Sequence, residues 1–320
     1  MIMVLLFVVL LLVFAVITTP NKSILEMLSG RSPVLRIPNL INILNAMAVT
    51  AFLTQGVSML MISGRLDLST GANGTLCGML LAAVLRDGMP LVPALLITLA
   101  VGAFIGLINA ALVNELKMAP FIATLATSSI VMGFVYLIAN KKSITIGNPV
   151  LTEFGKHMLF GYLPVSALVS FFFMIIMGII LHKTKFGRQV YLVGGNPQAS
   201  MLAGINPRRM SYILFIICGL FSSMAGITLV SRLQSASMDG VSAQRFMGIT
   251  AAVLGGISFG GGSGGMAGAF VGLLVLNTFN NGMTVVGFSP YWRTVASGML
   301  LVLALMLDFL QKKRSEKTIA

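Results

Sequence analysis

The sequence has few of the side chains that carry out catalysis. Its 320 residues include 8 Asp and Glu, 2 His and 2 Cys. His157 and His182 have no metal-ligand spacing to another His, Cys or acid, and Cys77 and Cys218 lie inside apolar runs. Catalytic sites need titratable groups that converge on one point. This composition therefore argues against a metal enzyme, a zinc site and a disulfide framework.

A second absence concerns ATP. The stretch 255–268 reads GGISFGGGSGGMAG and resembles a phosphate-binding loop only in its glycines. Such a loop also carries a Lys followed by Ser or Thr, because the lysine reaches the terminal phosphates. This stretch contains no lysine. We therefore expect that the chain binds no cofactor and does not hydrolyse ATP alone.

Apolar residues dominate the rest of the sequence. The chain is 57% hydrophobic and 9% charged, which leaves too little polar surface to cover a soluble globule of this size. Several apolar runs reach the roughly 20 residues that a helix needs to cross a bilayer. The net charge of +13 fits basic loops beside a membrane better than binding to nucleic acid. The composition predicts an all-α polytopic membrane protein embedded in a lipid bilayer.

Apolar runs bounded by Pro, Gly, Asn and charge predict about ten crossings within a single transmembrane domain, residues 1–320. The first run has no basic leader, so it is interpreted as a membrane helix and not as a signal peptide. The third and eighth runs are short and rich in small or polar residues, which indicates broken or re-entrant segments. The predicted crossings are 1–18, 40–63, 71–86, 91–114, 120–139, 162–181, 210–231, 246–259, 264–283 and 290–309.

Basic clusters predict the orientation, because cytoplasmic loops are enriched in Lys and Arg. The segment 182–209 holds five Lys and Arg residues and no acid, and four more basic residues stand in the C-terminal tail. With ten crossings, both termini and this segment are expected in the cytoplasm. The tail residues are Lys312, Lys313, Arg314 and Lys317.

A short internal echo links two of the predicted crossings. Gly102-Ala-Phe-Ile-Gly106-Leu107 in the fourth resembles Gly268-Ala-Phe-Val-Gly272-Leu273 in the ninth. Five crossings separate the two, so they would run in opposite directions, as inverted repeats do in many transporters. A chance match between two small-xxx-small packing motifs is the alternative.

Asp67 is the best candidate for an acid inside the membrane. A proton- or ion-coupled carrier needs such an acid to hold the coupling charge. Alternatively, Asp67 or Ser69 caps the helix that follows by accepting its free amide hydrogens. Because intramembrane acids are so few, we expect the energy for any transport to come from elsewhere.

Four sets of motifs resemble the permease subunits of ribose-type ABC importers, in the branched-chain amino acid/ribose permease superfamily. The resemblance covers residues 39–309. The motifs keep the order and spacing of that family and include its Ile-Asp-Leu-Ser-x-Gly pattern, with Leu in place of Ile. They are Asn39-Leu-Ile-Asn-Ile-Leu44 with Leu66-Asp-Leu-Ser-Thr-Gly71; Phe186-Gly-Arg; Val193-Gly-Gly-Asn196 with Ala203-Gly-Ile205; and Ala251-Ala-Val-Leu-Gly-Gly256, Asn280-Asn-Gly282 and Leu307-Asp308.

The resemblance implies a type II ABC-importer-like permease in the bacterial cytoplasmic (inner) membrane that admits a monosaccharide or sugar-like solute. It also implies partners: a second permease, identical or a sister chain; two ATPase subunits or one tandem ATPase, which bind ATP and Mg; and an extracytoplasmic solute-binding protein. A stand-alone carrier that uses Asp67 and a non-transporting membrane scaffold are the alternatives from other classes.

The segment 182–210 is similar to the cytoplasmic coupling loop of that family. In this interpretation, a short helix docks in a groove on the ATPase, glycines at its two ends make sharp turns, and Asn196 caps its start. Pro197 and Gln198 stand where the family often has an acid and Ala. The expected coupling residues are Gly194, Gly195, Asn196, Ala199, Leu202, Gly204 and Ile205.

A sugar path needs weak hydrogen-bonding groups within the crossings. Each such group has an alternative role as a polar contact between helices. Arg245 and Met247 stand where the family shows Glu and Asp, so Arg245, expected near the outer mouth, either pairs with an acidic solute or sister subunit or snorkels to the interface. Nucleoside-like and quorum-signal solutes stay open. The candidates are Asn45, Thr54, Gln55, Asp67, Phe121, Thr124, Thr127, Arg245, Asn280 and Asn281.

Overall fold

The computed structural model describes residues 2–19 and 32–319. The side chains of the basic tail and of Leu307-Asp308 lie outside the described residues. The α-helices are α1 (Ile2–Thr18), α3 (Ile37–Ile62), α4 (Thr70–Arg86), α5 (Leu91–Asn114), α6 (Pro120–Ala139), α7 (Pro149–Lys156), α8 (Val165–Lys183), α9 (Lys185–Gly195), α10 (Pro197–Leu202), α11 (Pro207–Leu233), α12 (Arg245–Leu254), α13 (Met266–Val286) and α14 (Pro290–Ile319).

Short elements complete the chain. Strand β1 (Ile144–Thr145) pairs antiparallel with β4 (Ser235–Ala236), with Ile144 opposite Ala236. Strand β2 (Met158–Leu159) pairs antiparallel with β3 (Leu163–Pro164), with Met158 opposite Pro164. The 3-10 helices are η3 (Pro33–Leu35) and η4 (Gly240–Gln244).

Asn-Pro pairs begin several helices. Asn148, Asn196 and Asn206 precede α7, α10 and α11, and each side chain accepts hydrogen bonds from backbone amides of the first turn. The proline that follows each asparagine is suited to a first helical position, where its missing N–H costs nothing. The local sequence therefore fixes where these helices start.

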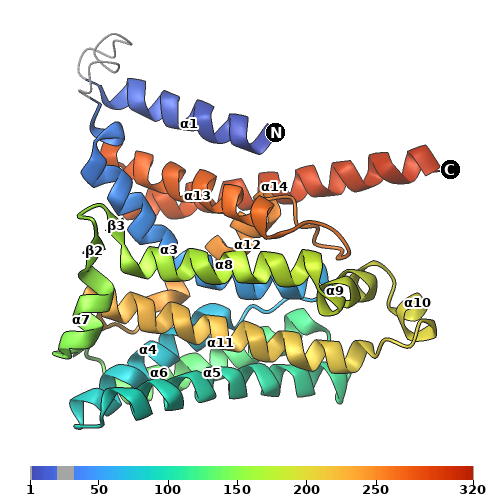
Figure 1. Ribbon diagram of the computed structural model, residues 1–320, viewed down its shortest axis with the longest axis horizontal. Coiled ribbons are helices and arrows are strands. Elements are labelled where there is room, and N and C mark those ends of the chain that lie inside the picture. The colour runs from blue at the N-terminus through green and yellow to red at the C-terminus, as the bar shows by residue number, and fades with distance from the viewer. Residues whose placement is uncertain (1, 20–31, 320) are drawn as a thin grey trace.

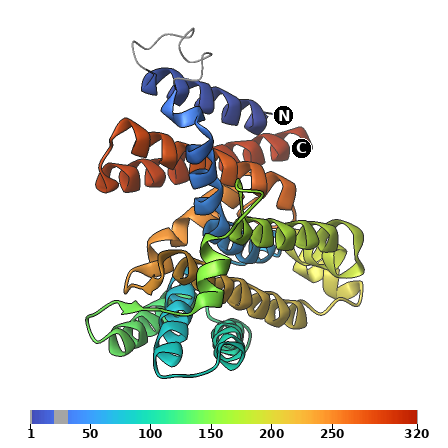
Figure 2. The same ribbon diagram turned by 60° about the vertical axis from the view of Figure 1, so that its left-hand side comes forward.

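Long helices lie side by side along the longest axis of the molecule (Figure 1). Helices α9 and α10 lie at one end of this bundle, which we call the α10 end, and α7 and the β2–β3 hairpin lie at the opposite α7 end. Figures 1 and 2 both show α1 beside α13 and α14 on one side, α4, α5 and α6 on the other, and α3 between them. Helix α1 starts and α14 ends toward the α10 end, so the two helices place both chain ends on one side.

Among the described residues, six helices are long and apolar enough to cross a membrane: α3, α5, α6, α8, α11 and α13. The apolar parts of α1 and α14, Met3–Thr18 and Pro290–Met306, are shorter. The multi-pass architecture is therefore established, whereas a full count of ten crossings is not confirmed. One predicted boundary was wrong, because residues 158–164 form the β2–β3 hairpin and α8 begins at Val165.

The third and eighth predicted crossings correspond to α4 and α12, two short helices whose first turns lie next to each other. A Cβ on Gly71 of α4 would lie 2.5 Å from the Cβ of Arg245, the first residue of α12. From there α4 runs to the α7 end, where Arg86 lies beside residues 145–149. Helix α12 has 10 residues, about 15 Å of helix, and so cannot span about 30 Å of hydrocarbon. The prediction of a broken segment at 246–259 is confirmed, because the helix stops at Leu254.

Helix α3 forms the centre of the core, with most of its length buried. It approaches α11 closely at Gly56, where a Cβ would lie 3.1 Å from the Cα of Cys218. Both cysteines are buried and free, as expected from their apolar surroundings.

The two copies of the sequence echo have the same packing role. On α5, a Cβ on Gly102 would lie 2.7 Å from the Gly219 carbonyl oxygen of α11, and a Cβ on Gly106 would overlap the Phe215 carbonyl. On α13, Cβ atoms on Gly268 and Gly272 would overlap the carbonyls of Gly255 and of Ala251 in α12. Each motif lets two backbones touch. The partner helices differ, α11 for the first motif and α12 for the second, so close helix packing accounts for both copies of the echo.

Candidate functional site

A short exposed helix protrudes at the α10 end. Asn196 caps α10 and accepts hydrogen bonds from the backbone amides of Gln198 and Ala199, both at 3.0 Å. The helix ends before Gly204, whose φ of +78° lies in the left-handed region that favours glycine. The Leu202 side chain is 93% exposed. Helix α10 therefore presents an apolar side chain outside the bundle.

The geometry corrects the prediction for Gly194 and Gly195. Both lie in the last turn of α9, and neither has a positive φ, so they make no sharp turn. A Cβ on Gly194 would overlap the carbonyl oxygen of Ile62, whereas a Cβ on Gly195 would meet nothing within 4 Å. Gly194 is required for close approach of two backbones and Gly195 is not. Ile205 follows α10 and donates its amide to the Ser200 carbonyl at 3.0 Å.

The surface around α10 is mainly basic. Glu115 follows α5, and its carboxylate accepts hydrogen bonds from the Tyr212 hydroxyl at 2.6 Å and from the Arg208 Nε at 3.0 Å. The Tyr212 hydroxyl, and then the Arg208 guanidinium, hold the pKa of Glu115 below its usual value. The side chains of segment 182–210 add further positive charge, from Lys183, Lys185, Arg188 and Arg209. Such a surface favours a partner with an acidic rim.

Asp67 is buried between α3 and α4, with 1% of its surface exposed. It accepts hydrogen bonds from the Ser69 amide at 2.7 Å, the Ser69 hydroxyl at 2.6 Å and the Asn109 Nδ2 at 3.4 Å. Within the described part of the chain, no Lys, Arg or His forms an ion pair with Asp67. The Asp67 carboxylate is therefore held by neutral donors only.

The capping interpretation of Asp67 and Ser69 needs correction. Ser69 is the N-cap of α4, but its side chain makes no capping hydrogen bond. Asp67 accepts the amide of Ser69 itself, one residue before the helix, and none of its other partners is an amide of the first turn of α4. Asp67 instead ties the start of α4 to Asn109 of α5, a residue that the sequence analysis missed.

Four candidate path residues are buried among the helices of this chain. Thr54 donates to the Thr50 carbonyl at 2.7 Å, and Gln55 donates to the Ser170 carbonyl of α8 at 3.0 Å. The Gln55 Oε1 atom is buried and has no hydrogen-bond partner within the described residues. Thr124 accepts the Leu68 amide at 3.1 Å, and Thr127 donates to the Ala123 carbonyl of its own helix. Of these contacts, the Gln55 bond joins two helices, the Thr124 bond joins a helix to a loop, and the other two lie within one helix.

Other candidates lie apart from this group. Asn281 exchanges two hydrogen bonds with Asn39, at 2.8 and 3.0 Å, and so links α13 to the start of α3. Asn280 accepts from the Ser297 hydroxyl of α14 at 3.1 Å. Phe121 is 54% exposed at the start of α6, and Asn45 is half-buried on α3. The structure therefore does not gather the predicted path residues in one cavity.

Arg245 lies where the starts of α12 and α4 meet. It begins α12 beside Gly71, and the first turns of α4 pack at Gly74 against Ser222 in the middle of α11. Its guanidinium carbon lies 5.0 Å from the centre of the Phe246 ring, and no acid among the described residues forms an ion pair with it. Arg245 is thus a half-buried cation at the start of α12 that makes a cation–π contact with an exposed ring.

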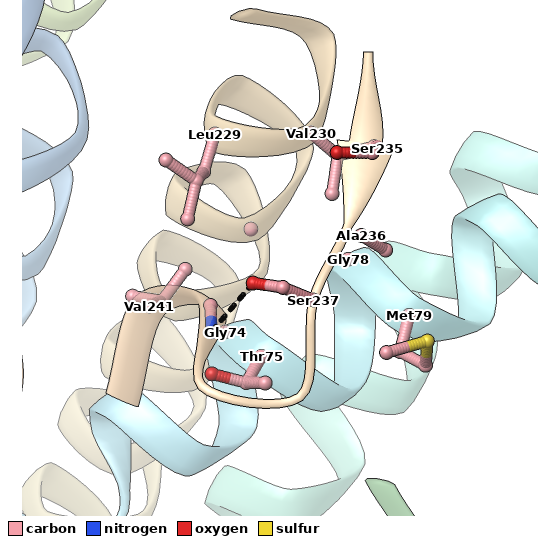
Figure 3. Close-up of a pocket in the computed structure, with 12 residues that line it drawn as sticks. Gly74, Thr75, Gly78, Met79, Leu229, Val230, Ser235, Ala236, Ser237 and Val241 are labelled. Atoms are coloured by element: carbon pink, nitrogen blue, oxygen red, sulfur yellow. Dashed lines mark hydrogen bonds between the residues drawn. The ribbon is translucent and has the colours of Figure 1, made fainter. Parts of the chain in front are cut away.

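A small pocket lies between α4, α11 and the segment 235–241 (Figure 3). Figure 3 shows the hydrogen bond, 3.2 Å long, from the Gly240 amide to the Ser237 hydroxyl at its edge. The cavity volume is about 10 Å³, room for about one water molecule. This pocket cannot hold a sugar. Within the described residues, no three His, Cys, Asp or Glu side chains lie close enough to hold a metal ion.

Comparison with known proteins identifies similar chains. Residues 39–305 match the family model described as the permease component of branched-chain amino acid transport systems. The ribose import permease protein of Bacillus subtilis is 34% identical over 272 residues, which cover 84% of this chain and 84% of the relative. A probable ABC transporter permease protein of Sinorhizobium fredii is 31% identical over 276 residues, 86% of this chain and 83% of the relative. The galactose/methyl galactoside import permease protein of Haemophilus influenzae is 28% identical over 302 residues, 87% and 88% of the two chains.

Proposed function

Because this chain belongs to the family of branched-chain amino acid transport system permease components, we propose that it is the permease subunit of an ABC importer for a monosaccharide. The family match over residues 39–305 is the observation that carries the proposal. Import permeases for ribose and for galactose and methyl galactoside are among its relatives, which favours a neutral, hydroxyl-rich solute. The family description itself names branched-chain amino acids, so the choice of a sugar rests on these relatives.

The α10 end supports a docking site for ATPase subunits. An exposed leucine on a capped helix, surrounded by basic side chains, is suited to an apolar groove with an acidic rim. In this proposal, two ATPase subunits or one tandem ATPase bind ATP and Mg at that end, which faces the bacterial cytoplasm together with both termini. The α7 end then receives solute from an extracytoplasmic binding protein.

Solute passes, in this proposal, between two permease subunits, either two copies of this chain or this chain and a sister. The burial of Thr54, Gln55 and Thr124 within one chain supports a path that opens only when helices move. ATP binding closes the ATPases, both α10 helices move with them, and the cavity between the permeases changes sides. The unpaired Gln55 Oε1 is the polar atom best suited to a sugar hydroxyl along that path.

Asp67 decides between this proposal and a stand-alone carrier. Asp67 is a buried acid that forms no ion pair within the described residues, and this favours proton coupling. We expect Asp67→Asn to keep ATP-dependent uptake, because the amide oxygen can still accept the Ser69 amide. The expected cost is about 1–2 kcal/mol of stability from weaker hydrogen bonds.

The measurement is uptake of labelled ribose and galactose into right-side-out membrane vesicles. These either contain ATP and receive the binding protein from outside, or receive a pH gradient alone. Asp87→Asn, at the opposite end of α4 on the surface, is the matched control. Uptake driven by the pH gradient in the parent and lost in Asp67→Asn alone would establish the carrier and contradict the importer.

A further inference from the structure

Three backbone segments meet without intervening side chains beside α10. The end of α3, the last turn of α9 and the loop before α13 are brought together at residues 62–64, 194–195 and 260–262. The Gly262 amide donates to the Ile62 carbonyl at 2.8 Å. A Cβ on Gly261 would lie 2.8 Å from the Gly194 carbonyl oxygen and from the Gly64 Cα. We call these three segments the glycine junction.

Glycine is required in this junction for two separate reasons. Gly64, Gly261 and Gly262 have φ values of +75°, +84° and +76°, which side-chain-bearing residues rarely adopt. Gly194 has an ordinary helical φ, but a Cβ there would overlap the Ile62 carbonyl and lie 2.7 Å from the Gly262 nitrogen. The junction is therefore a set of direct backbone contacts between α9, α3 and the loop.

Side chains of α8 and α9 hold the same loop a few residues later. The Tyr191 hydroxyl of α9 donates to the Gly264 carbonyl at 2.7 Å. The His182 ring at the end of α8 lies beside Gly265, where a Cβ would be 3.0 Å from the His182 Cε1. The loop that leads from α12 to α13 is thus attached to α9 both at the glycine junction and through Tyr191, and the end of α8 lies beside it.

Helix α9 is separated from α10 by Asn196 alone. A displacement of α10 is therefore passed to the end of α9. The contacts at the junction join backbone atoms, so no side chain between them can change rotamer and absorb that displacement. Packed backbones resist deformation. The displacement reaches α3, which carries Thr54 and Gln55, and the loop that joins α12 to α13.

We propose that the glycine junction transmits the movement of α10 to α3 and to the α12–α13 loop, with Gly194 as a positioning residue for transport. This inference rests on the proposed function, in which α10 is the ATPase docking helix. Neither the family match nor the relatives assign a role to this contact.

The test compares Gly194→Ala with Gly195→Ala in the permease–ATPase complex, reconstituted in liposomes with its binding protein. The two positions are neighbours in one helix, and only Gly195 has room for a methyl group. ATP hydrolysis and labelled-sugar uptake are measured on the same preparation. We expect the Gly194→Ala permease to retain its ATPase and the complex to hydrolyse ATP. The amount of sugar imported per ATP should fall about tenfold, which is the size of effect expected when a contact in a coupling network is lost. Gly195→Ala should match the parent.

Tyr191→Phe provides a second variant that adds no volume. It removes the hydrogen bond to Gly264 and should also lower sugar imported per ATP, with only a small fall in melting temperature. If the Gly194→Ala permease does not assemble with its ATPase, the Tyr191→Phe variant alone tests the inference. An unchanged ratio of uptake to hydrolysis in both variants, or in Tyr191→Phe when it alone assembles, would overturn the inference. Failure of the parent chain to bind any ATPase would instead overturn the proposed function.

Discussion

Leu202→Asp is expected to abolish most ATP-driven uptake while the permease still folds. The Leu202 side chain is 93% exposed on α10, so the substitution disturbs no core packing. An apolar anchor buried in a partner's groove typically contributes about 2 kcal/mol, and its loss weakens binding by about 30-fold. The aspartate is also repelled by an acidic rim on the ATPase, the kind of rim that complements the basic α10 end.

The measurement is the amount of ATPase retained by the purified permease, together with sugar uptake in reconstituted liposomes. Leu116→Asp is the matched control, since Leu116 is 66% exposed at the end of α5, on the same end of the bundle. The control variant should retain its ATPase. Equal retention by both variants would place the docking surface away from α10.

Gly106→Ala is expected to cause a large loss of stability. The new Cβ would overlap the Phe215 carbonyl oxygen, an atom of the α11 backbone that cannot rotate away. Overpacking of a well-packed core costs up to about 3 kcal/mol. The loss of stability is measured by heating the protein in mild detergent and recording the fraction that remains monodisperse at each temperature.

Gly133→Ala on α6 is the control for this second change. A Cβ at Gly133 would meet nothing within 4 Å, so the variant should be neutral or gain about 0.5–1 kcal/mol from helix propensity. Gly272→Ala on α13, where the second copy of the motif packs against α12, should likewise be less stable than Gly133→Ala. Equal melting temperatures for the Gly106 and Gly133 variants would show that α5 and α11 do not touch as described.

Helix positions could be predicted from the sequence wherever a strong local signal exists. Apolar length fixes the long helices, and the Asn-Pro pairs fix the starts of α7, α10 and α11. The break after Leu254 follows from Gly255 and Gly256. The start of the sixth predicted crossing was wrong because strand β3, Leu163–Pro164, runs directly into the apolar sequence of α8.

Glycine shows where local signals are insufficient. Gly204 is needed for its left-handed φ, whereas Gly194 is needed for contact with Ile62. Both roles produce the same letter in the sequence, and the second depends on a neighbour far away in the chain. The expectation of a turn at Gly194 and Gly195 was therefore wrong, although the short helix and its asparagine cap were predicted correctly.

The candidate path residues show the same limit for polar side chains. Thr54, Gln55 and Asn281 all stand in apolar runs, where a polar residue marks either a solute contact or a bond between helices. Their partners, such as Ser170 and Asn39, belong to other helices and depend on tertiary packing. Asn109 was missed for that reason, because only the fold brings it to Asp67.

The most direct test of the import role is the composition of the complex that this chain forms. The permease is purified in mild detergent from its source membrane, and the proteins that accompany it are identified by mass spectrometry. We predict an ATPase subunit that is lost when residues 197–202 are replaced by a flexible Gly-Ser linker. Recovery of the chain without any ATPase, together with sugar uptake driven by an ion gradient in liposomes, would contradict the import role.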